Sequence, residues 1–596
     1  MEEMTDEKRN LLNKLESWLQ QAVGGSGDAA YRDTAIEDLE FYALKQDDAA
    51  TLAKLDSLKR PASVYDEVRH KIDAIIAQFH AVTEAPAIEP VASNDTQLDE
   101  LMTSVLKYFR RRMDILDVEH ECAEYMTKTG LAYQYFYVDK MNPMKPQLKN
   151  KYVPGFNVYK DPRSTAYDML DARFIFFEKW LSDDEMEDNF PGTLDLNTIK
   201  EGATQGSIGG VSPSYYSTVR DVYRVVECYY RKSIEVVYYV NPVNQKDDWA
   251  SPEDWEKIKD ALIAEFQIPE EELQFMPGRK SVVHYAIFSD NIIIEEGICP
   301  YWFCKEWGYF PLVQYGAYKD DSLNRYFGAI TALKDPQRVF NTLVRQLTHL
   351  LQTAPRGILM HEIGAILNID DYEQRSADPT YHMEVQQGGL DKVKFSNQPQ
   401  ISPIYESLIA KTKQGMKDTS GVQDSMLGIQ TSSREPGVTA EMRQNAGIAI
   451  LTIIFSNYHK SRKIATRILL SLIQQYVTEP MLIRITGQDG AQLLQINTQN
   501  NPELEGFNDI TALEYDLAVE DYPDKFSNSD TTLKLLADFG MNNPGTVPLE
   551  LMLQFMPIAD SLKQQMLAYR DAQQEAQRLQ LEAEAAAKAK PTGGTK

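Results

Sequence analysis

The sequence feature that most constrains the fold is the stretch 322–478, in which three long helical patterns alternate with two polar inserts. Helices are expected at 336–352, where an Asp-Pro pair favours a helix start, and at 403–418. A third helix, 438–478, would be roughly 60 Å long at about 1.5 Å per residue. The stretch thus contains two helices around a small insert, then a polar loop, then a long helix. This order predicts that the stretch lines an elongated object or channel.

The composition indicates a globular protein with several domains. The chain has 596 residues, of which 43% are hydrophobic and 10% aromatic, more than a single core uses. Its formal net charge of -27 argues against a surface that grips nucleic acid by neutralising phosphates. The charge does not exclude a surface along which nucleic acid passes without sticking.

The cysteines and the apolar runs indicate a reducing, cytosolic environment. Cys122, Cys228, Cys299 and Cys304 are too few and too scattered for a disulfide framework, so reduced, buried thiols are expected. Cys299 and Cys304 lack a second pair, so no zinc site is expected there. No apolar run reaches the roughly 18 residues of a membrane span. The acidic N-terminus does not resemble a signal peptide.

The periodicity along the chain predicts an α+β fold that is mainly helical. Apolar stripes at helical spacing occur in 1–22, 31–46, 64–82 and 96–129, and Gly130 is expected to cap the last of these helices. From residue 131 on, short β-branched and aromatic runs predict a sheet-containing domain. Within it, helices are expected after Ser182 and after Ser251, and a hairpin is expected around residues 289–291. Strands after residue 480 are expected to return to a sheet, and 560–590 is expected to be a long helix.

Catalytic motifs are absent from the sequence. GGSG near residue 25 lacks the lysine of a phosphate-binding loop, and no two histidines have metal-ligand spacing on one helix. The pairs Asp183–Asp184 and Asp320–Asp321 could hold a metal ion. Both stand at expected helix starts, where the helix dipole favours carboxylates in any case. We therefore expect no enzyme activity, no cofactor and no metal.

Three segments together carry a resemblance to a known family: 159–192, which contains YKDPRSTAYDMLDARF; 328–347, GAITALKDPQRVFNTLVRQL; and 484–523, which contains NDITALEYDLAVEDYP. In this combination the chain resembles the portal, or head-to-tail connector, proteins of tailed phages, particularly the large portals of short-tailed phages. The resemblance extends over residues 30–570.

The resemblance implies a dodecameric ring at one capsid vertex of the virion, assembled in the host cytoplasm. Its central channel would carry double-stranded DNA during packaging and ejection. The implied partners are the terminase large subunit, the major capsid and scaffolding proteins, and tail adaptor proteins, with no membrane.

The resemblance also implies a division of the chain into portal regions. These would be an N-terminal helical arm (1–30), a wing (31–321), a first stem helix region (322–353), a clip (354–400), a second stem helix (401–422), a tunnel loop (423–437), a long wing or crown helix (438–479), returning wing strands (480–525), and a crown with a C-terminal helix (526–596).

Two groups of site residues follow from that division. The tunnel loop would present to DNA Gln430, Thr431, Ser432, Ser433 and Arg434, and a ring would turn the single arginine into a circle of positive charge. An ordinary solvent loop is the alternative. The stem helices carry cations that would face the channel or pair between subunits: Arg338, Arg345, Lys411, Lys413 and Lys417.

Two other functions compete with the DNA conduit. One is a head or tail adaptor or scaffold protein of the virion that binds only proteins and forms no pore. The other is an enzyme such as a nuclease or terminase subunit, which would need a phosphate loop or an acidic metal cluster. Stoichiometry separates the first from a portal, because an adaptor would not close into a ring with a duplex-wide hole.

Overall fold

The computed structural model describes most of the chain up to residue 478 and short segments beyond it: 6–80, 87–89, 96–139, 146–190, 216–217, 222–241, 246–266, 274–289, 292–353, 359–375, 382–395, 403–422, 437–478, 481–487, 490–496, 518–520 and 569–570. It divides into two compact units. Unit 1 comprises Met1–Ala35, Ile76–Phe327 and Leu451–Lys596; unit 2 comprises Ile36–Ile75 and Gly328–Ile450. Helices and sheets are both present, in agreement with the mixed fold class predicted from the sequence.

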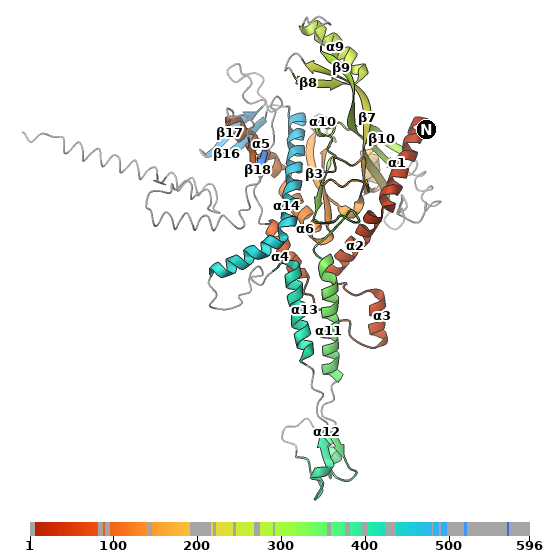
Figure 1. The fold of residues 1–596 in the computed structure, drawn as a ribbon, viewed down its shortest axis with the longest axis vertical. Helices are drawn as coiled ribbons and strands as arrows, with labels where there is room; N and C mark the ends of the chain where they lie inside the picture. The colour runs from red at the N-terminus through yellow and green to blue at the C-terminus, as the bar shows by residue number, and fades with distance from the viewer. Residues whose placement is uncertain are drawn as a thin grey trace, which may run out of the picture. The chain divides into compact units, whose positions relative to one another are not determined.

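Unit 1 is built on an antiparallel seven-stranded sheet (Figure 1). Its main path runs β10-β9-β7-β5-β4, and two short strands pair with β7. The strands are β4 (Val158–Lys160), β5 (Phe174–Leu181), β6 (Tyr216–Ser217), β7 (Val222–Asn241), β8 (Lys246–Ala250), β9 (Phe275–Ser289) and β10 (Ile292–Ile298). The expected hairpin around residues 289–291 is therefore confirmed as the β9–β10 pair.

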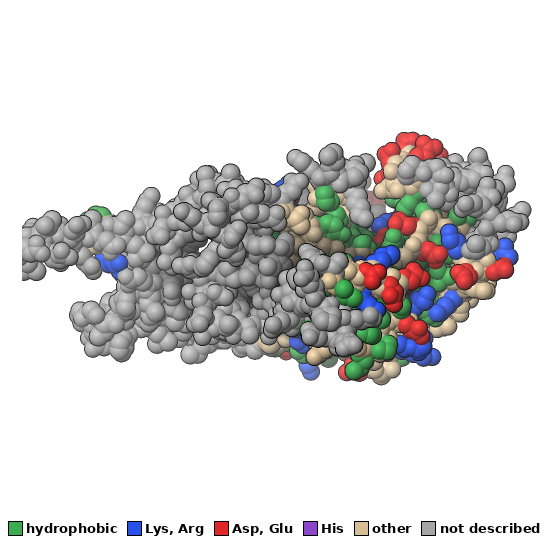
Figure 2. Space-filling view, turned by 90° about the horizontal axis from the view of Figure 1, so that it is seen from above, with side chains coloured by type: hydrophobic (Ala, Val, Ile, Leu, Met, Phe, Trp, Pro, Cys, Tyr) green, Lys and Arg blue, Asp and Glu red, His purple; other side chains and the backbone are tan. Residues whose placement is uncertain are grey.

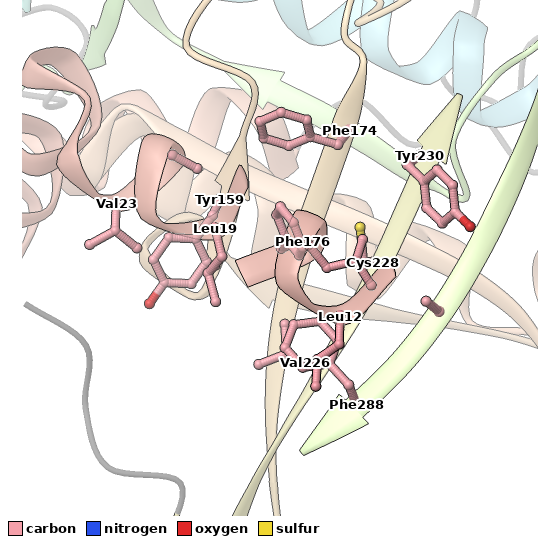
Figure 3. Packing of buried hydrophobic residues seen from close by; sticks show 13 residues of the cluster. Leu12, Leu19, Val23, Tyr159, Phe174, Phe176, Val226, Cys228, Tyr230 and Phe288 are labelled. Atoms are coloured by element: carbon pink, nitrogen blue, oxygen red, sulfur yellow. The ribbon is translucent and has the colours of Figure 1, made fainter. Parts of the chain in front are cut away.

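Helix α1 (Asp6–Gly24) covers one face of this sheet with a stripe that includes Leu12, Leu15 and Leu19. The stripe meets aromatic side chains from the strands in a buried cluster (Figure 3). The Trp18 ring stacks on Phe174 with 5.0 Å between the ring centroids. Because α1 supplies a large share of this apolar contact, the N-terminal helix is part of the core of unit 1.

A second, three-stranded sheet of unit 1 has the order β11-β2-β3 and packs against α6 (Ile115–Thr129). Its strands are β2 (Leu131–Asp139), β3 (Gln147–Pro154) and β11 (Leu312–Gly316). The expected single helix 96–129 is wrong: α5 (Thr96–Arg112) and α6 are separated at Asp114, whose φ of 50° is left-handed. Gly130 does end α6, with a φ of 92° and its N–H donating to the Met126 carbonyl.

The far end of the β7–β9 pair has a small core of its own, where Tyr239, Ala250, Trp255 and Leu262 pack together. Helix α9 (Pro252–Phe266) provides two of these residues. It begins as predicted, with Ser251 Oγ accepting the Asp254 N–H at 3.1 Å. Helix α7 (Asp183–Asn189) also begins as predicted, through a capping box of Ser182 and Glu185.

Helix α14 (Gly437–Tyr476) is 40 residues long, as expected for this stretch. Its part in unit 1 is buried along one side and carries Arg462, which shares the carboxylate of Glu119 with Arg110. Burial opposes the charge of Glu119, but the two guanidinium groups outweigh it and hold the pKa of Glu119 below its usual value.

Short strand pairs complete unit 1. Strands are present after residue 480, as expected: β16 (Met481–Gly487) pairs with β17 (Gly490–Ile496), and β18 (Ala518–Glu520) returns to pair with β1 (Ala87–Glu89). The remaining elements are η1 (Gly155–Asn157), α10 (Trp302–Glu306), and the pair β12 (Tyr318–Asp320) and β13 (Arg325–Phe327). The expected helix 560–590 lies outside the described residues except for 569–570.

Candidate assembly arm

Unit 2 contains two long helices that pack side by side, α11 (Lys334–Thr353) and α13 (Ile404–Ser420) (Figure 1). We name these two helices, with the residues of 36–75 that pack on them, the assembly arm, or simply the arm. Both match the helices expected from the sequence to within two residues at each end. Asp335 is not the N-cap of α11, because η3 (Thr331–Leu333) runs directly into the helix and places Asp335 in its first turn. Phe340 of α11 and Met416 of α13 are buried, while most other α13 side chains are partly or fully exposed.

The remaining elements of unit 2 come from three parts of the chain. Residues 36–75 contribute the ends of α2 (Ser26–Tyr42) and α4 (Arg69–His80), with α3 (Ala49–Ser57) between them. Helix α4 is shorter than the expected 64–82. The insert between α11 and α13 contains β14 (Leu359–His361), α12 (Ile369–Arg375), η4 (Leu390–Lys392) and β15 (Val393–Phe395), with β14 antiparallel to β15.

A polar row on α11 fastens the segment around α3 to this helix. Gln337, Asn341 and Arg345 are four residues apart and therefore lie on one helix face. Arg345 binds Asp47 through both terminal nitrogens, at 2.9 and 2.5 Å, and donates from Nε to the Ser63 carbonyl at 2.7 Å. Both side chains of the Arg345–Asp47 pair are 9% exposed, so the pair is well shielded from solvent.

The other two members of the row extend the same attachment. Asn341 Nδ2 donates to Gln46 Oε1 at 2.7 Å, and Asn341 Oδ1 accepts the Tyr65 N–H at 3.0 Å. Gln337 Nε2 donates to the Tyr65 carbonyl at 2.6 Å. The two ends of the segment 47–63 are thus hydrogen-bonded to one face of α11; we name this segment the α3 loop.

The start of α11 is fixed by a cluster of charges. Lys334 Nζ lies 2.7 Å from Glu37 Oε2 and 2.8 Å from Asp38 Oδ1, and Arg338 Nη2 donates to Glu37 Oε1 at 2.6 Å. Asp38 is fully buried, and burial raises its pKa to about 6 although Lys334 and a hydrogen bond from Thr331 favour its charge. The Lys334 hydrogen bond, opposed by burial and aided by Arg338, lowers the pKa of Glu37.

A second ion pair joins α13 to the segment before α4. Lys413 Nζ lies 2.5 Å from Glu67 Oε1, and Lys71 lies 3.5 Å from the other oxygen of the same carboxylate. Burial opposes the charge of Glu67, but Lys413 and Lys71 outweigh it, and the pKa of Glu67 is lowered. The carboxylate therefore stays ionised and neutralises part of the positive charge of α13.

Stem cations expected from the sequence form ion pairs with carboxylates of their own chain: Arg338 with Glu37, Arg345 with Asp47, and Lys413 with Glu67. Lys411 is exposed on α13, and Lys417 is partly exposed. The expected tunnel-loop residues Gln430, Thr431, Ser432, Ser433 and Arg434 lie outside the described residues. A role of either group at DNA or between subunits stays a prediction.

The polar row on α11 was only partly visible in the sequence. Arg345 is among the residues expected there, but Gln337, Asn341 and Asp47 are not. The four-residue spacing of Gln337, Asn341 and Arg345 within one predicted helix is the signal that could have found the row. Nothing in local spacing indicates Asp47, because it is 298 positions away from Arg345.

The insert between α11 and α13 exposes apolar side chains. Met360, Ile363, Leu367 and Leu390 are between 54% and 103% exposed, and all four lie near the β14–β15 pair or in its connections. Exposed apolar groups gathered in so small a segment are typical of a surface that contacts other proteins.

Among the described residues, no three His, Cys, Asp or Glu side chains are grouped so that they could hold a metal ion. The four cysteines are all buried and free, as predicted. Over much of the described part of the face in Figure 2, acidic and basic side chains are interspersed, and one group of acidic side chains is gathered at its upper edge.

Over the part of the chain that the structure describes, no helix combines the length and the apolar character needed to cross a bilayer.

Two packed helices, an exposed apolar insert between them and the exposed helix α3 give unit 2 surfaces typical of proteins that contact other chains. Comparison with known proteins gives the family. Residues 18–592 match the family model of phage P22-like portal proteins, so the chain belongs to the P22-like portal protein family. This is a structural family and not a family of enzymes.

A relative supports the family. A protein named portal protein, from Acyrthosiphon pisum secondary endosymbiont phage 1, is 22% identical to this chain over 447 residues. The aligned region covers 70% of this chain and 58% of the relative, so the chain spans less than two thirds of the relative's length.

Proposed function

We propose that this protein forms the portal of a phage capsid: a ring of about twelve copies at one vertex, whose channel passes double-stranded DNA during packaging and ejection. The observation that carries the proposal is the match to the P22-like portal family over residues 18–592. The proposed partners are the terminase large subunit, the major capsid and scaffolding proteins, and tail adaptors. The proposed location is the virion, reached through assembly in the host cytoplasm.

Within this proposal, α11 and α13 are the stem helices of the regions 322–353 and 401–422. The insert 354–400 is the clip, and its exposed Ile363 and Leu390 support a role in meeting other proteins. Region 423–437 is the tunnel loop, with Gln430 to Arg434 nearest the DNA. The wing comprises 31–321 and 480–525, and the crown 526–596.

The charge of the chain is compatible with a conduit. With a net charge of -27, each copy as a whole repels a polyanion, which limits tight phosphate binding. The cations Arg338, Arg345 and Lys413 are partly neutralised by carboxylates of the same chain, so few stem charges remain to hold DNA. Lys411, which is exposed on α13, is the stem cation proposed to touch passing phosphates.

The test is the native mass of the purified protein, combined with end-on electron-microscope images. A closed ring of about a dozen copies with a hole wide enough for duplex DNA is the expected result. A small closed oligomer without a pore would contradict the portal and favour a virion adaptor. A protein that stays monomeric at all concentrations, and also with capsid and scaffolding proteins present, would contradict both.

A further inference from the structure

A cavity of about 380 Å³ lies in unit 1, where the end of α1 meets the loop between β4 and β5. Its lining combines the end of α1 with both ends of that loop and includes Gln20, Gln21, Gly24, Gly25, Arg163 and Arg173. Of the lining residues that the structure describes, two are arginines and none is acidic. In a chain with a net charge of -27, such a local excess of positive charge indicates a site for an anion. We name this cavity the arginine pocket.

A single buried carboxylate fixes both arginines. Asp161 is fully buried, and its oxygens accept the backbone N–H of Arg163 at 3.1 Å and the backbone N–H of Arg173 at 3.2 Å. The Arg173 guanidinium also donates to it, from Nε at 2.6 Å and from Nη2 at 2.9 Å. Burial opposes the charge of Asp161, but these donors outweigh it and hold the pKa of Asp161 below its usual value. The two arginines are therefore held in a defined position relative to each other.

The loop between the two arginines is braced as well. Asp171 accepts hydrogen bonds from Ser164 Oγ and from the Thr165 N–H, both at 2.7 Å. Asn324 Nδ2 donates to the Ser164 carbonyl at 2.8 Å. Because the loop is tied to itself and to the rest of unit 1, less entropy is lost when a ligand binds to its side chains.

Both arginines keep hydrogen-bond donors for a ligand. Arg163 is exposed, and its guanidinium forms no ion pair or hydrogen bond with the residues that the structure describes. The Arg173 side chain is 38% exposed, and its Nη1 takes no part in the pair with Asp161. Two guanidinium groups can bind two edges of one tetrahedral oxyanion, whereas a carboxylate has only two oxygens to share between them. These donors therefore favour a phosphate group over a carboxylate.

The helix ends beside the arginine pocket do not decide its sign. Helix α1 ends at Gly24 and α2 begins at Ser26, so a negative C-terminal end and a positive N-terminal end adjoin each other. Their contributions oppose each other, and the charge of the pocket is set by the arginines.

We propose that the arginine pocket binds a phosphate group, either free phosphate or the phosphate of a small phosphorylated molecule. Arg163 and Arg173 bind the phosphate oxygens, and the amides of Gln20 and Gln21 are further donors in the same lining. A volume of about 380 Å³ is in the range of small-ligand sites, so a group attached to the phosphate also fits. The bound phosphate joins the end of α1 to the loop after β4 and so stabilises the packing of the N-terminal helix. This inference does not rest on the proposed function.

Isothermal titration calorimetry of the full-length chain with sodium phosphate tests the site. The ionic strength is kept constant, because salt screens arginine–phosphate contacts. The wild-type chain should bind phosphate, and Arg163→Gln should weaken the binding about tenfold or more while leaving the Arg173–Asp161 pair intact. Arg111→Gln, at an exposed arginine of α5 in unit 1, is the matched control and should leave the affinity unchanged.

A second variant changes the pocket from the side of α1. Gln21→Glu places a carboxylate in the lining and should also weaken phosphate binding about tenfold, through repulsion between like charges. Arg163 and Gln21 are both exposed, and circular dichroism before the titration establishes that the variants are folded. Saturating phosphate should raise the thermal unfolding midpoint of the wild-type chain and of Arg111→Gln more than that of either pocket variant.

The outcomes also identify the source of the phosphate. Adenosine monophosphate that binds the wild-type chain more tightly than phosphate, but not Arg163→Gln, supports a small phosphorylated molecule; equal or weaker binding supports free phosphate. Acetate that binds as tightly as phosphate would mean that the pocket takes a carboxylate, which overturns the proposal. No phosphate binding by the wild-type chain, or equal binding by Arg163→Gln, overturns it too. None of these results depends on whether the chain forms a ring, so the portal proposal stands or fails separately.

Discussion

Asp38 shows how a single buried carboxyl group makes the arm sensitive to pH. Burial raises its pKa to about 6, compared with about 3.9 for an unfolded aspartate. Between these values the folded chain holds the proton more tightly than the unfolded chain does. Acidification through this window therefore adds stability, and at neutral pH the buried charge costs stability.

We predict that the wild-type protein gains about 1.4 kcal/mol relative to the Asp38→Asn variant when the pH falls from about 8 to about 5. Hydrogen exchange of the α11 amides, corrected for the intrinsic pH dependence of exchange, measures this difference locally. Asp56→Asn, at an exposed residue of the same unit, is the control. A constant difference between wild type and Asp38→Asn at both pH values would mean that Asp38 does not titrate in this range.

At the residue scale, the sequence identifies the cations of the arm but not their partners. Arg338 and Arg345 stand in a predicted helix, where channel contacts and ion pairs are equally compatible with the pattern. Their partners, Glu37 and Asp47, are 301 and 298 positions away. Such pairs arise only when the chain folds, so helical spacing cannot reveal them.

Elements with strong local signals are the part of the fold that the sequence predicts well. The starts of α7 and α9 and the end of α6 follow from caps, and the limits of α11, α13 and α14 follow to within two residues from local patterns, although Asp335 lies in the first turn of α11 and does not cap it. The break between α5 and α6 does not, because apolar spacing continues across it while the backbone of Asp114 turns left-handed. The pairing of β18 with β1 joins residues far apart in the chain, and no local pattern in the sequence indicates it.

Gly130 ends helix α6, and among helix ends its substitution should lower the free energy of unfolding the most. Its φ of 92° disfavours any side chain, and a Cβ there would lie 2.4 Å from the carbonyl carbon of Phe327. We predict that Gly130→Ala lowers the free energy of unfolding of unit 1 by at least about 2 kcal/mol, as expected for strain added to overpacking.

Urea unfolding followed by tryptophan fluorescence measures this loss, because all six tryptophans belong to unit 1. Gly24→Ala is the matched control. Gly24 has ordinary φ and nothing within 4 Å of its added Cβ, so its unfolding curve should coincide with that of the wild-type protein. Equal curves for the two variants would show that the region around Gly130 adjusts without cost.

At the scale of the whole molecule, the division into units is what the sequence does not indicate. Residues 36–75 belong to the same unit as α11 and α13, although more than 250 residues of unit 1 separate them in the chain. No composition shift marks either boundary, and both boundaries of this segment fall inside helices, α2 and α4. The division into portal regions that the resemblance implies stays a prediction.

The net charge of the whole chain sets the salt dependence of assembly. Each copy carries -27, so bringing copies together costs electrostatic energy that salt screens, with a screening length of about 10 Å at 0.1 M. We predict that the concentration at which copies dissociate falls as sodium chloride rises from about 0.02 to about 0.2 M. Mass photometry at each salt concentration measures it. An increase over that range would mean that ion pairs dominate the contacts between copies.

The long β7–β9 pair has a consequence for how such a chain can change over evolutionary time. Its register is unbroken from Val226 opposite Phe288 to Tyr239 opposite Phe275, and its far end has a separate small core with α9. Because side chains alternate between the two faces, removing two residues from each strand keeps every remaining residue on its own side. The far end can thus shorten, lengthen or be replaced by a tight turn after Glu235 and before Arg279 while the sheet beneath α1 keeps its packing. Related proteins can in this way have β7–β9 pairs of very different lengths and still share the packing of α1 on the sheet.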